Sequence, residues 1–270
     1  MSVATVAVVT GAGRGIGREI TALLAAAGHT VLATDIDESV LAQTRSAIPG
    51  RIETARLDVR RPDEHRAVAR HAEELGRLTV WINNAGIMQT GDAVAQPDDV
   101  VERMVAINLL GVMHGSRAAV EVMRRHGSPC DIINISSLSA FGPVPGLAVY
   151  GATKAAVLSW TTSMAYEMRS AGSPVRLHAL CPDAARTSLL MDNAHDAGSR
   201  LIFSAPRLLD AGEVARAAVA LLGSRQLVRT LPPGRGLMVR ISGLIPRAVG
   251  PALRILALIG DRRRQAESSR

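Results

Sequence analysis

A tyrosine and a lysine stand four residues apart in the run Tyr150-x-x-x-Lys154. Lys154 is the only lysine among the 31 basic residues, so every other strongly basic side chain is an arginine. Side chains at positions i and i+4 of a helix lie on one face, within reach of each other. A phenol has an unperturbed pKa of about 10, and a nearby cation favours its ionised form. We therefore expect Lys154 to lower the pKa of Tyr150, so that the pair can transfer a proton near neutral pH.

The tyrosine–lysine spacing is weak alone, because it also occurs where a structural tyrosine lies beside a surface lysine. A second motif, the glycine-rich run Thr10-Gly11-Ala12-Gly13-Arg14-Gly15-Ile16-Gly17, closes the first apolar run, Val6–Thr10. Between a strand and a helix, closely spaced glycines let the backbone approach a pyrophosphate, and the helix N-terminus offers free N–H groups. We expect a dinucleotide to bind here, rather than a plain loop. The expected contacts are Gly11, Arg14, Gly15, Ile16 and Gly17.

Asp35 closes the second apolar run, 18 residues after Gly17. An acidic side chain about 20 residues beyond the glycine turn accepts hydrogen bonds from the adenosine ribose. Its charge would repel a 2′-phosphate, which predicts NAD rather than NADP as the cofactor. Arg14 is a counter-signal, since a cation near the phosphates could hold a 2′-phosphate. An alternative role for Asp35 is to cap a helix that starts near Ser39, although Asp37 could take that role instead.

Short apolar runs alternate with stretches of helical periodicity. This alternation predicts an α/β fold, a Rossmann-type doubly wound parallel sheet with helices on both faces. The expected strands are 6–10, 30–34, 52–57, 79–82, 131–136 and 175–180, and the expected helices are 16–27, 39–47, 62–75, 98–126 and 147–171. One domain is expected over 1–230, with a substrate lid at about 183–208, followed by a C-terminal extension over 231–270 that is not an independent domain.

Together the motifs resemble those of the short-chain dehydrogenase/reductase family, in its compact single-domain branch, over roughly residues 5–225. The matching runs stand in the family's order: Thr10-Gly11-x-x-x-Gly15-x-Gly17, Leu57-Asp58-Val59, Asn83-Asn84-Ala85-Gly86, Asn108 before Gly111, Ser137 and Tyr150-x-x-x-Lys154. The match is specific for fold and chemistry and poor for substrate.

The resemblance implies a catalytic set of Asn108, Ser137, Tyr150 and Lys154. The family's serine stands thirteen residues before its tyrosine, which selects Ser137. Tyr150 would act as general base in oxidation and as general acid in reduction, while the nicotinamide carries the hydride. Lys154 would also bind the nicotinamide ribose, Ser137 would hydrogen-bond the substrate oxygen, and Asn108 would hold a water in a proton path. The alternative for Ser137 is a strand-end serine that bonds only to backbone.

Further cofactor contacts are implied by the resemblance at the ends of later strands. They are Asp58 and Val59 beside the adenine, Asn84, Ala85 and Gly86 beside the cofactor, and Pro182 and Thr187 toward the carboxamide. Two positions depart from the family pattern, since Asp183 replaces a glycine and His178 replaces an asparagine. Aspartate tolerates unusual backbone angles less well than glycine, so the departure concerns the conformation of the lid rather than the chemistry.

Apolar residues follow the catalytic serine. Leu138, Phe141 and Val144 lie between Ser137 and Tyr150 in the sequence, and we expect these five to contact the substrate. Together with Leu147, and with the apolar segment 237–259 that would surround the entry, they predict a hydrophobic alcohol or ketone, such as a lipid, steroid-like or isoprenoid compound.

The composition disfavours several other classes of protein. Aromatic residues make up 2% of the chain, which argues against a stacking surface for single-stranded nucleic acid. Cys130, Cys181 and the seven histidines show no spacing typical of a disulfide framework or a metal site. Met1 is followed almost at once by an apolar strand, so we expect no signal peptide and a reduced, cytoplasmic setting.

The net charge of +7 is concentrated at one end of the chain. Residues 225–270 hold ten arginines against Asp261 and Glu267, a balance of +8, so residues 1–224 carry −1. That distribution suits an appendage facing an anionic surface better than a nucleic-acid-binding fold.

The C-terminal extension leaves alternatives open. Arg240, Arg247 and Arg254 are seven residues apart and would lie along one side of a helix. Three arginines and two prolines within 237–260 argue against a membrane-crossing helix. The tail is expected either to lie on an anionic membrane, at the inner face, or to pack over the substrate mouth or a neighbouring subunit.

Three functions compete. The first is an NAD-dependent interconversion of a hydrophobic secondary alcohol and its ketone. The second is an NADPH-dependent 3-oxoacyl thioester reductase, with Arg124, Arg125 and Arg169 facing an acidic carrier protein, and the third is a non-catalytic nucleotide-binding regulatory module. The intact catalytic set favours an enzyme. Segments 98–126 and 147–171 could pair with copies of themselves, which predicts a homodimer or homotetramer.

Overall fold

The computed structural model of the protein describes residues 4–244 and 249–268. Within them, seven parallel strands form one sheet in the order β3-β2-β1-β4-β5-β6-β7. The strand order reverses between β1 and β4, the switch point at which doubly wound proteins bind ligands. The strands are β1 (Thr5–Thr10), β2 (Thr30–Asp35), β3 (Ile52–Arg56), β4 (Arg77–Asn83), β5 (Cys130–Ile135), β6 (Val175–Pro182) and β7 (Val228–Leu231).

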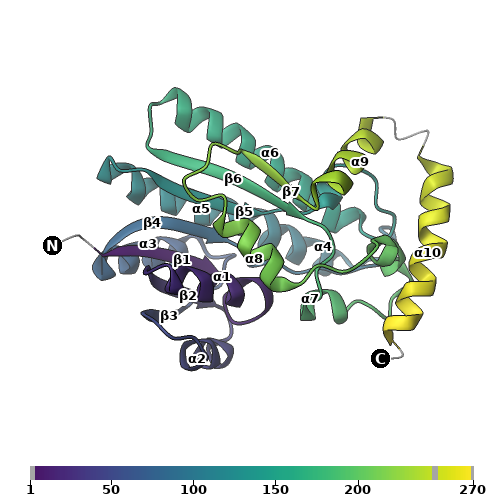
Figure 1. Ribbon diagram of the computed structural model, residues 1–270, viewed down its shortest axis with the longest axis horizontal. Coiled ribbons are helices and arrows are strands. Elements are labelled where there is room, and N and C mark those ends of the chain that lie inside the picture. Colours follow the sequence, from purple (N-terminus) through teal and green to yellow (C-terminus); the bar gives the residue numbers. More distant parts are fainter. Residues whose placement is uncertain (1–3, 245–248, 269–270) are drawn as a thin grey trace.

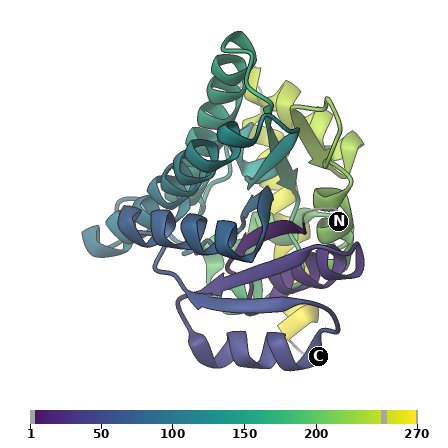
Figure 2. The same ribbon diagram turned by 90° about the vertical axis from the view of Figure 1, so that its left-hand side faces the viewer.

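Helices cover both faces of the sheet (Figures 1 and 2). Helices α1 and α8 pack on one face, and α3, α5 and α6 pack on the other. The α-helices are α1 (Gly15–Ala26), α2 (Glu38–Ala47), α3 (Pro62–Leu75), α4 (Asp98–Val105), α5 (Gly111–Met123), α6 (Ala148–Ser170), α7 (Ser188–Met191), α8 (Ala211–Val219), α9 (Pro233–Leu244) and α10 (Gly250–Ser268). The other helical segments are the π-helical η1 (Ala106–Leu110) and the 3₁₀ helices η2 (Arg124–His126), η3 (Leu138–Ala140) and η4 (Ala197–Ser204).

Local sequence accounts for many of these elements. Strand β5 is buried along its whole length, which explains its apolar residues Ile132, Ile133 and Ile135, while its polar Asp131 and Asn134 are buried with hydrogen-bond partners. Helix α3 begins with Pro62 in its first turn and with the acidic Asp63 and Glu64 near its positive end. A capping box opens α8, because the Asp210 side chain accepts from the backbone of Glu213 while the Glu213 side chain accepts from Asp210.

The predicted doubly wound architecture is confirmed, and each of the six expected strands matches to within two residues at either end. The sequence pattern misses β7, which has four half-buried residues and an arginine in its centre. It also misses α8. The single helix expected over 98–126 is wrong in detail, because η1 separates α4 from α5 and η2 ends the segment.

The C-terminal extension forms two helices rather than one. Helix α9 ends at Leu244 and α10 begins at Gly250, so Arg240 and Arg254 do not belong to one described helix. Arg247 lies outside the described residues. Strand β7 ends at Leu231, so the sheet reaches one residue past the boundary that the sequence suggests at 230.

A buried carboxylate ties β5 to β6 and to the segment before β7. Asp131 accepts two 2.8 Å hydrogen bonds from the guanidinium of Arg176 and one of 3.1 Å from the N–H of Gly223. His178 lies between Asp131, at 3.0 Å, and the carbonyl oxygen of Gln226, at 2.7 Å. Burial acts to raise the pKa of Asp131, but these hydrogen bonds outweigh it and lower the pKa to about 2. The histidine that replaces the family's asparagine thus takes part in this network.

We expect Asp131→Asn to lower the free energy of unfolding by about 2 kcal/mol or more, because it leaves the half-buried Arg176 without its charge partner. Asp63→Asn is the control, since Asp63 pairs with Arg66 at the surface, with 81% of its side chain exposed. That change should cost less than about 1 kcal/mol. Urea denaturation measures both, and equal losses in the two variants would show that the buried pair adds no stability.

Candidate active site

Two adjoining cavities open at the carboxyl ends of the strands, the edge at which open α/β sheets bind ligands. The glycine-loop cavity is lined by the turn after β1, and the tyrosine cavity holds Ser137, Tyr150 and Lys154. Five residues line both cavities: Ile16, Asn84, Gly86, Thr187 and Leu189. A ligand that fills both therefore runs from the glycine turn to the tyrosine.

Most of the cofactor residues predicted from the sequence surround the glycine-loop cavity. They are Gly11, Arg14, Gly15, Ile16, Asp35, Asp58, Val59, Asn84, Ala85, Gly86 and Thr187. Pro182 lies in the tyrosine cavity instead. Gly17 lines neither, because it packs beneath the turn, where a Cβ would lie 2.1 Å from the carbonyl oxygen of Gly11. Gly11 itself has φ +63°, and a Cβ there would lie 2.8 Å from the Cα of Ala85.

Hydrogen bonds fasten the glycine turn to the end of β4. The hydroxyl of Thr10 accepts the N–H groups of Asn84, at 3.0 Å, and of Ala85, at 3.1 Å. The Asn84 side chain donates to the carbonyl oxygens of Thr10 and Gly11, both at 3.0 Å. The two predicted motifs therefore form one unit, which sets the shape of the cavity between them.

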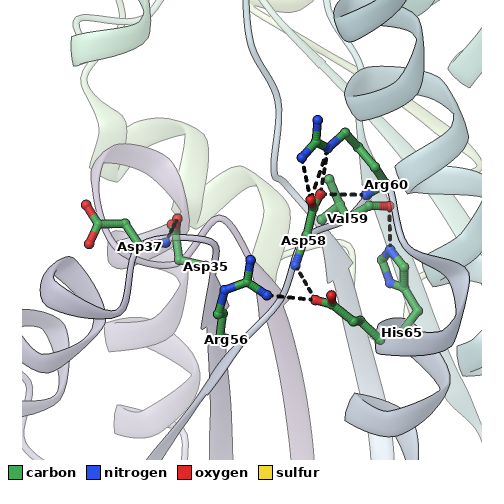
Figure 3. Close-up of polar contacts among 8 residues, drawn as sticks. Asp35, Asp37, Arg56, Asp58, Val59, Arg60 and His65 are labelled. Carbon is green, nitrogen blue, oxygen red and sulfur yellow. Dashed lines mark hydrogen bonds and ion pairs between the residues drawn. The ribbon is translucent and has the colours of Figure 1, made fainter.

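Two carboxylates at the end of β2, those of Asp35 and Asp37, have different roles (Figure 3). Asp35 lines the glycine-loop cavity and accepts the N–H of Gly13 at 3.1 Å. Asp37 caps α2 by accepting the N–H and the hydroxyl of Ser39, and these hydrogen bonds lower the pKa of Asp37. Asp37 rather than Asp35 is thus the cap, which leaves the Asp35 carboxylate beside the cavity.

Asp58 is held by an arginine that the sequence reasoning missed (Figure 3). The guanidinium of Arg60 donates to both carboxylate oxygens, with the shortest contact at 2.5 Å, and this lowers the pKa of Asp58. Arg60 and Arg103 also line the glycine-loop cavity. The position of Arg60, two residues beyond Asp58, is the signal that could have found it. With Arg14, three arginines therefore line the same cavity as the carboxylate of Asp35.

Main-chain contacts position Lys154 between β5 and α6. Its ammonium group donates to the carbonyl oxygen of Ile135 at 3.0 Å, and Ser136 donates to the carbonyl oxygen of Lys154 at 2.8 Å. The ammonium nitrogen lies 5.6 Å from the centre of the Tyr150 ring. Both serines line the tyrosine cavity, but the Ser136 hydroxyl is engaged by the backbone of Lys154, whereas the Ser137 hydroxyl accepts the N–H of Ser139 at 3.2 Å and acts on the pKa of Tyr150.

The pKa shifts differ from the direction expected from the sequence. Burial raises the pKa of Tyr150 to about 12, against which the hydrogen bond with Ser137 acts in the lowering direction. Burial lowers the pKa of Lys154 to about 8. The expectation that Lys154 lowers the pKa of Tyr150 is therefore not met by the protein groups, because burial of the tyrosine is the larger cause of the shift and the ammonium group is engaged by the carbonyl oxygen of Ile135. A Tyr150 hydroxyl with this pKa holds its proton at neutral pH.

Asn108 lies in η1 and lines neither cavity. Its side chain accepts the N–H of Ile87 and donates to the carbonyl oxygen of Ile87, both at 2.8 Å, and also donates to Thr153 at 3.3 Å. A Cβ on Gly86 would lie 3.3 Å from the Asn108 side-chain oxygen and 3.6 Å from the Lys154 nitrogen. Asn108 thus fixes the loop after β4 beside Lys154, and its role in holding water stays a prediction.

The tyrosine cavity is apolar on several sides. Leu138 and Val144 line it as expected, but Phe141 does not, because its ring packs near Leu138 and lies 4.6 Å beneath the guanidinium of Arg240. Leu147 and Val239 line it too, as the apolar run before Tyr150 and the segment 237–259 suggest. Apolar side chains that the sequence does not single out complete the lining: Met88, Leu189, Leu190, Leu201 and Ile202. Three segments distant in the sequence, the lid, α9 and the loop after β5, therefore meet here.

An ion pair joins the substituted position after β6 to α9. The carboxylate of Asp183 lies 2.5 Å from the guanidinium of Arg235, and 13% and 17% of the two side chains are exposed. Arg235 also donates to Ser204 of η4 at 3.0 Å, and both members of the pair line the tyrosine cavity. Among the described residues only glycines have positive φ. Asp183 therefore fits the turn without a strained backbone. The C-terminal extension covers one side of this cavity.

The sequence matches the family described as short chain dehydrogenase over residues 5–198. The chain belongs to this family. The probable oxidoreductase EphD of Mycobacterium tuberculosis is 30% identical over 267 residues, which cover 93% of this chain and 45% of that protein. The 3β-hydroxysteroid dehydrogenase 2 of Eggerthella lenta is 34% identical, over 68% of this chain and 72% of that protein.

A solved structure shows the same architecture. The short chain dehydrogenase/reductase from Burkholderia phymatum, in complex with NAD, has a TM-score of 0.81 and 27% identity over 88% of this chain and 92% of that one. The chain spans less than half the length of its EphD relatives. Over residues 4–244 and 249–268, no helix has the length and apolar character needed to cross a bilayer.

We expect Asp183→Asn and Arg235→Gln each to lower the free energy of unfolding by about 2–4 kcal/mol, because each leaves a buried charge unpaired. The double variant removes both charges and should recover at least about 1 kcal/mol relative to the sum of the single losses. Urea denaturation of the four proteins completes the cycle. Strictly additive losses would mean that the two side chains do not stabilise each other.

Proposed function

We propose that the protein is an NAD-dependent oxidoreductase that interconverts a hydrophobic secondary alcohol and its ketone, with Tyr150 as general acid and base. The observation that carries this proposal is the convergence of Ser137, Tyr150 and Lys154 in a cavity that continues directly into the glycine-loop cavity. The glycine turn fits a pyrophosphate, because Gly11 and Gly17 leave no room for side chains where the turn closes. Membership of the short chain dehydrogenase family supports the same reaction class.

In this mechanism the bound NAD supplies or receives the hydride. The residues around the glycine turn would hold its phosphates, Asp35 its adenosine ribose, and Lys154 its nicotinamide ribose. Tyr150 keeps its proton at neutral pH, so its hydroxyl can donate to a carbonyl oxygen in the reducing direction. Ser137 would hydrogen-bond the same oxygen and stabilise the charge that develops on it. In the oxidising direction Tyr150 must first lose its proton, which Lys154 favours only while it is itself charged.

The preference for NAD rests on Asp35. Its carboxylate lies beside the glycine-loop cavity and is held toward the turn by the N–H of Gly13, where it would repel a 2′-phosphate. Arg14, Arg60 and Arg103 line the same cavity and act in the opposite direction. Arg60 is engaged by Asp58, which lessens its charge toward a ligand. The NAD complex of the Burkholderia phymatum relative supports the proposal.

The substrate class follows from the lining of the tyrosine cavity, in which apolar residues from the loop after β5, the lid and α9 surround the catalytic serine and tyrosine. The Asp183–Arg235 pair adds polar groups at one side but is internally neutralised. A relative named as a 3β-hydroxysteroid dehydrogenase supports an alcohol carried on a large apolar frame.

The positions of Arg124, Arg125 and Arg169 weaken the thioester reductase alternative, which relied on them to bind a carrier protein. Arg124 and Arg125 follow α5, and Arg169 ends α6, so all three precede the strands β5 and β6. They therefore lie toward the amino ends of the strands, opposite the edge at which the cavities open. Arg125 also pairs with Glu121 and Glu73. A carrier protein bound there would not reach the tyrosine. A non-catalytic regulatory module stays as the second alternative, and turnover of any ketone would exclude it.

Assembly and location are also proposals. Segment 98–126 and helix α6 would form the contacts of a homodimer or homotetramer, and Tyr166 on α6 is 62% exposed. The setting would be the cytoplasm.

We expect kcat/KM for reduction of linear ketones to rise with chain length. Each buried methylene contributes about 0.8 kcal/mol, which corresponds to roughly a fourfold gain until the cavity is full. Initial rates of NADH oxidation measure this series. Tyr150→Phe should reduce every rate by at least about 100-fold while NADH binding, followed by fluorescence, is retained.

A preference for short polar ketones would overturn the substrate class and leave the chemistry intact. Undiminished turnover by Tyr150→Phe would overturn the proton-transfer role itself. The two outcomes are therefore separable in one set of measurements.

We expect Asp35→Ala to shift the ratio of NADPH to NADH affinity toward NADPH by at least about tenfold, an effect of about 1.4 kcal/mol. Asp37→Ala is the matched control, since it removes a carboxylate two residues away that caps α2. It should lower thermal stability without changing the ratio. Titrations with both nucleotides measure the effect, and an unchanged ratio in Asp35→Ala would show that this carboxylate does not read the ribose.

A further inference from the structure

Helix α9 is fixed to the protein through one face. A Cβ on Gly236 would lie 2.2 Å from the hydroxyl oxygen of Thr230, and a Cβ on Gly243 would lie 1.9 Å from the carbonyl oxygen of Phe141. Val239, between them, lines the tyrosine cavity. These positions recur at three and four residues, so they share one side of the helix. The small residues let α9 pack closely, as a wall of the cavity.

The opposite face of α9 is apolar and exposed. Leu237, Met238, Ile241 and Leu244 fall on it, with 61%, 49%, 50% and 82% of their surfaces exposed. Large apolar side chains gathered on one exposed face mark a surface that is covered in use. Of the ten large apolar residues exposed in the described chain, six lie on α9 and α10.

Helix α10, at the edge of the molecule, also packs through one side and exposes apolar residues on the other (Figure 1). Its inner side packs on the lid, where a Cβ on Gly260 would lie 1.8 Å from the carbonyl oxygen of Arg200. Arg263 donates to the carbonyl oxygen of Ser204 at 3.1 Å. On the other side Ile255 and Leu258 are 60% and 66% exposed.

Positive charge accompanies these exposed apolar residues. Arg240 on α9 and Arg254 and Arg262 on α10 are exposed. Helix α9 contains no acidic residue, and among the described side chains of α10 the one carboxylate, Asp261, pairs with Arg264. Apolar side chains flanked by arginine are typical of helices that lie in the interface of an anionic membrane. Each arginine near such a surface contributes about 1 kcal/mol of attraction.

We propose that the outer faces of α9 and α10 form a docking surface for a membrane that contains anionic lipid. We call it the C-terminal face, and it consists of Leu237, Met238, Ile241, Leu244, Arg254, Ile255, Leu258 and Arg262. A second copy related by twofold symmetry would bring two equal sets of arginines together, which disfavours self-association through this face. An anionic bilayer satisfies both the apolar side chains and the charge.

Docking would also place the catalytic cavity near the lipid. Val239 reaches the tyrosine cavity from the inner side of α9, so the helix that touches the membrane is also a wall of that cavity. An apolar substrate dissolved in the bilayer would then meet the cavity without crossing water. This last step rests on the proposed function, whereas the docking itself does not.

The test is cosedimentation of the full chain with vesicles of phosphatidylcholine alone and of phosphatidylcholine mixed with phosphatidylglycerol. We expect binding to the mixed vesicles, weakened by added salt because charge attraction is screened. The triple variant Leu237→Gln, Ile241→Gln, Leu244→Gln and the double variant Arg254→Gln, Arg262→Gln should each weaken binding at least tenfold, since each removes one of the two contributions.

Val94→Gln is the matched control, because Val94 is 95% exposed and lies far along the chain from the C-terminal face. It should bind like the parent. Thermal unfolding verifies that each variant is folded, and turnover of a soluble ketone reports separately on the proposed function. Equal binding by parent and triple variant, or no binding to mixed vesicles, would overturn the proposal. A dimer seen by light scattering that the triple variant abolishes would do so as well, since a second copy would then cover the face.

Discussion

The arrangement of the site depends on two hydrogen bonds between the end of β5 and the beginning of α6. The ammonium group of Lys154 donates to Ile135, and the neighbouring Ser136 donates to the carbonyl oxygen of Lys154. These bonds fix α6 against the strand, so that Ser137 and Tyr150 face the same cavity although thirteen residues separate them. Lys154 is buried there, which lowers its pKa to about 8, and the burial of Tyr150 itself raises the pKa of the phenol to about 12.

Features that depend on short-range sequence could be predicted. The strands at the centre of the sheet are buried on both faces, so their apolar runs identify them. The glycine turn is recognisable because Gly11 and Gly17 permit approaches that a side chain would block. Asp35 could be placed beside it by spacing alone, and the competing capping role went to Asp37 because that residue immediately precedes α2.

Features that depend on packing between distant segments could not be predicted. Strand β7 is short and half-buried, and only its pairing with β6 identifies it. Phe141 is apolar and close to Ser137 in sequence, yet its ring lies beneath Arg240, which comes from a helix about a hundred residues later. The pKa of Tyr150 follows from burial, which the sequence does not report. Asp183 looked like a departure that affects the turn, whereas its significance is the partner Arg235.

The contact between α10 and η4 has a mechanical consequence. Gly260 lies against the backbone of Arg200, and Arg263 holds the carbonyl oxygen of Ser204, so the lid and a helix of 19 residues are joined. If η4 moves outward, α10 must either move with it or lose these contacts. The rate at which ligands enter and leave the cavity would then depend on what α10 is bound to, and immobilising α10 would slow each catalytic cycle.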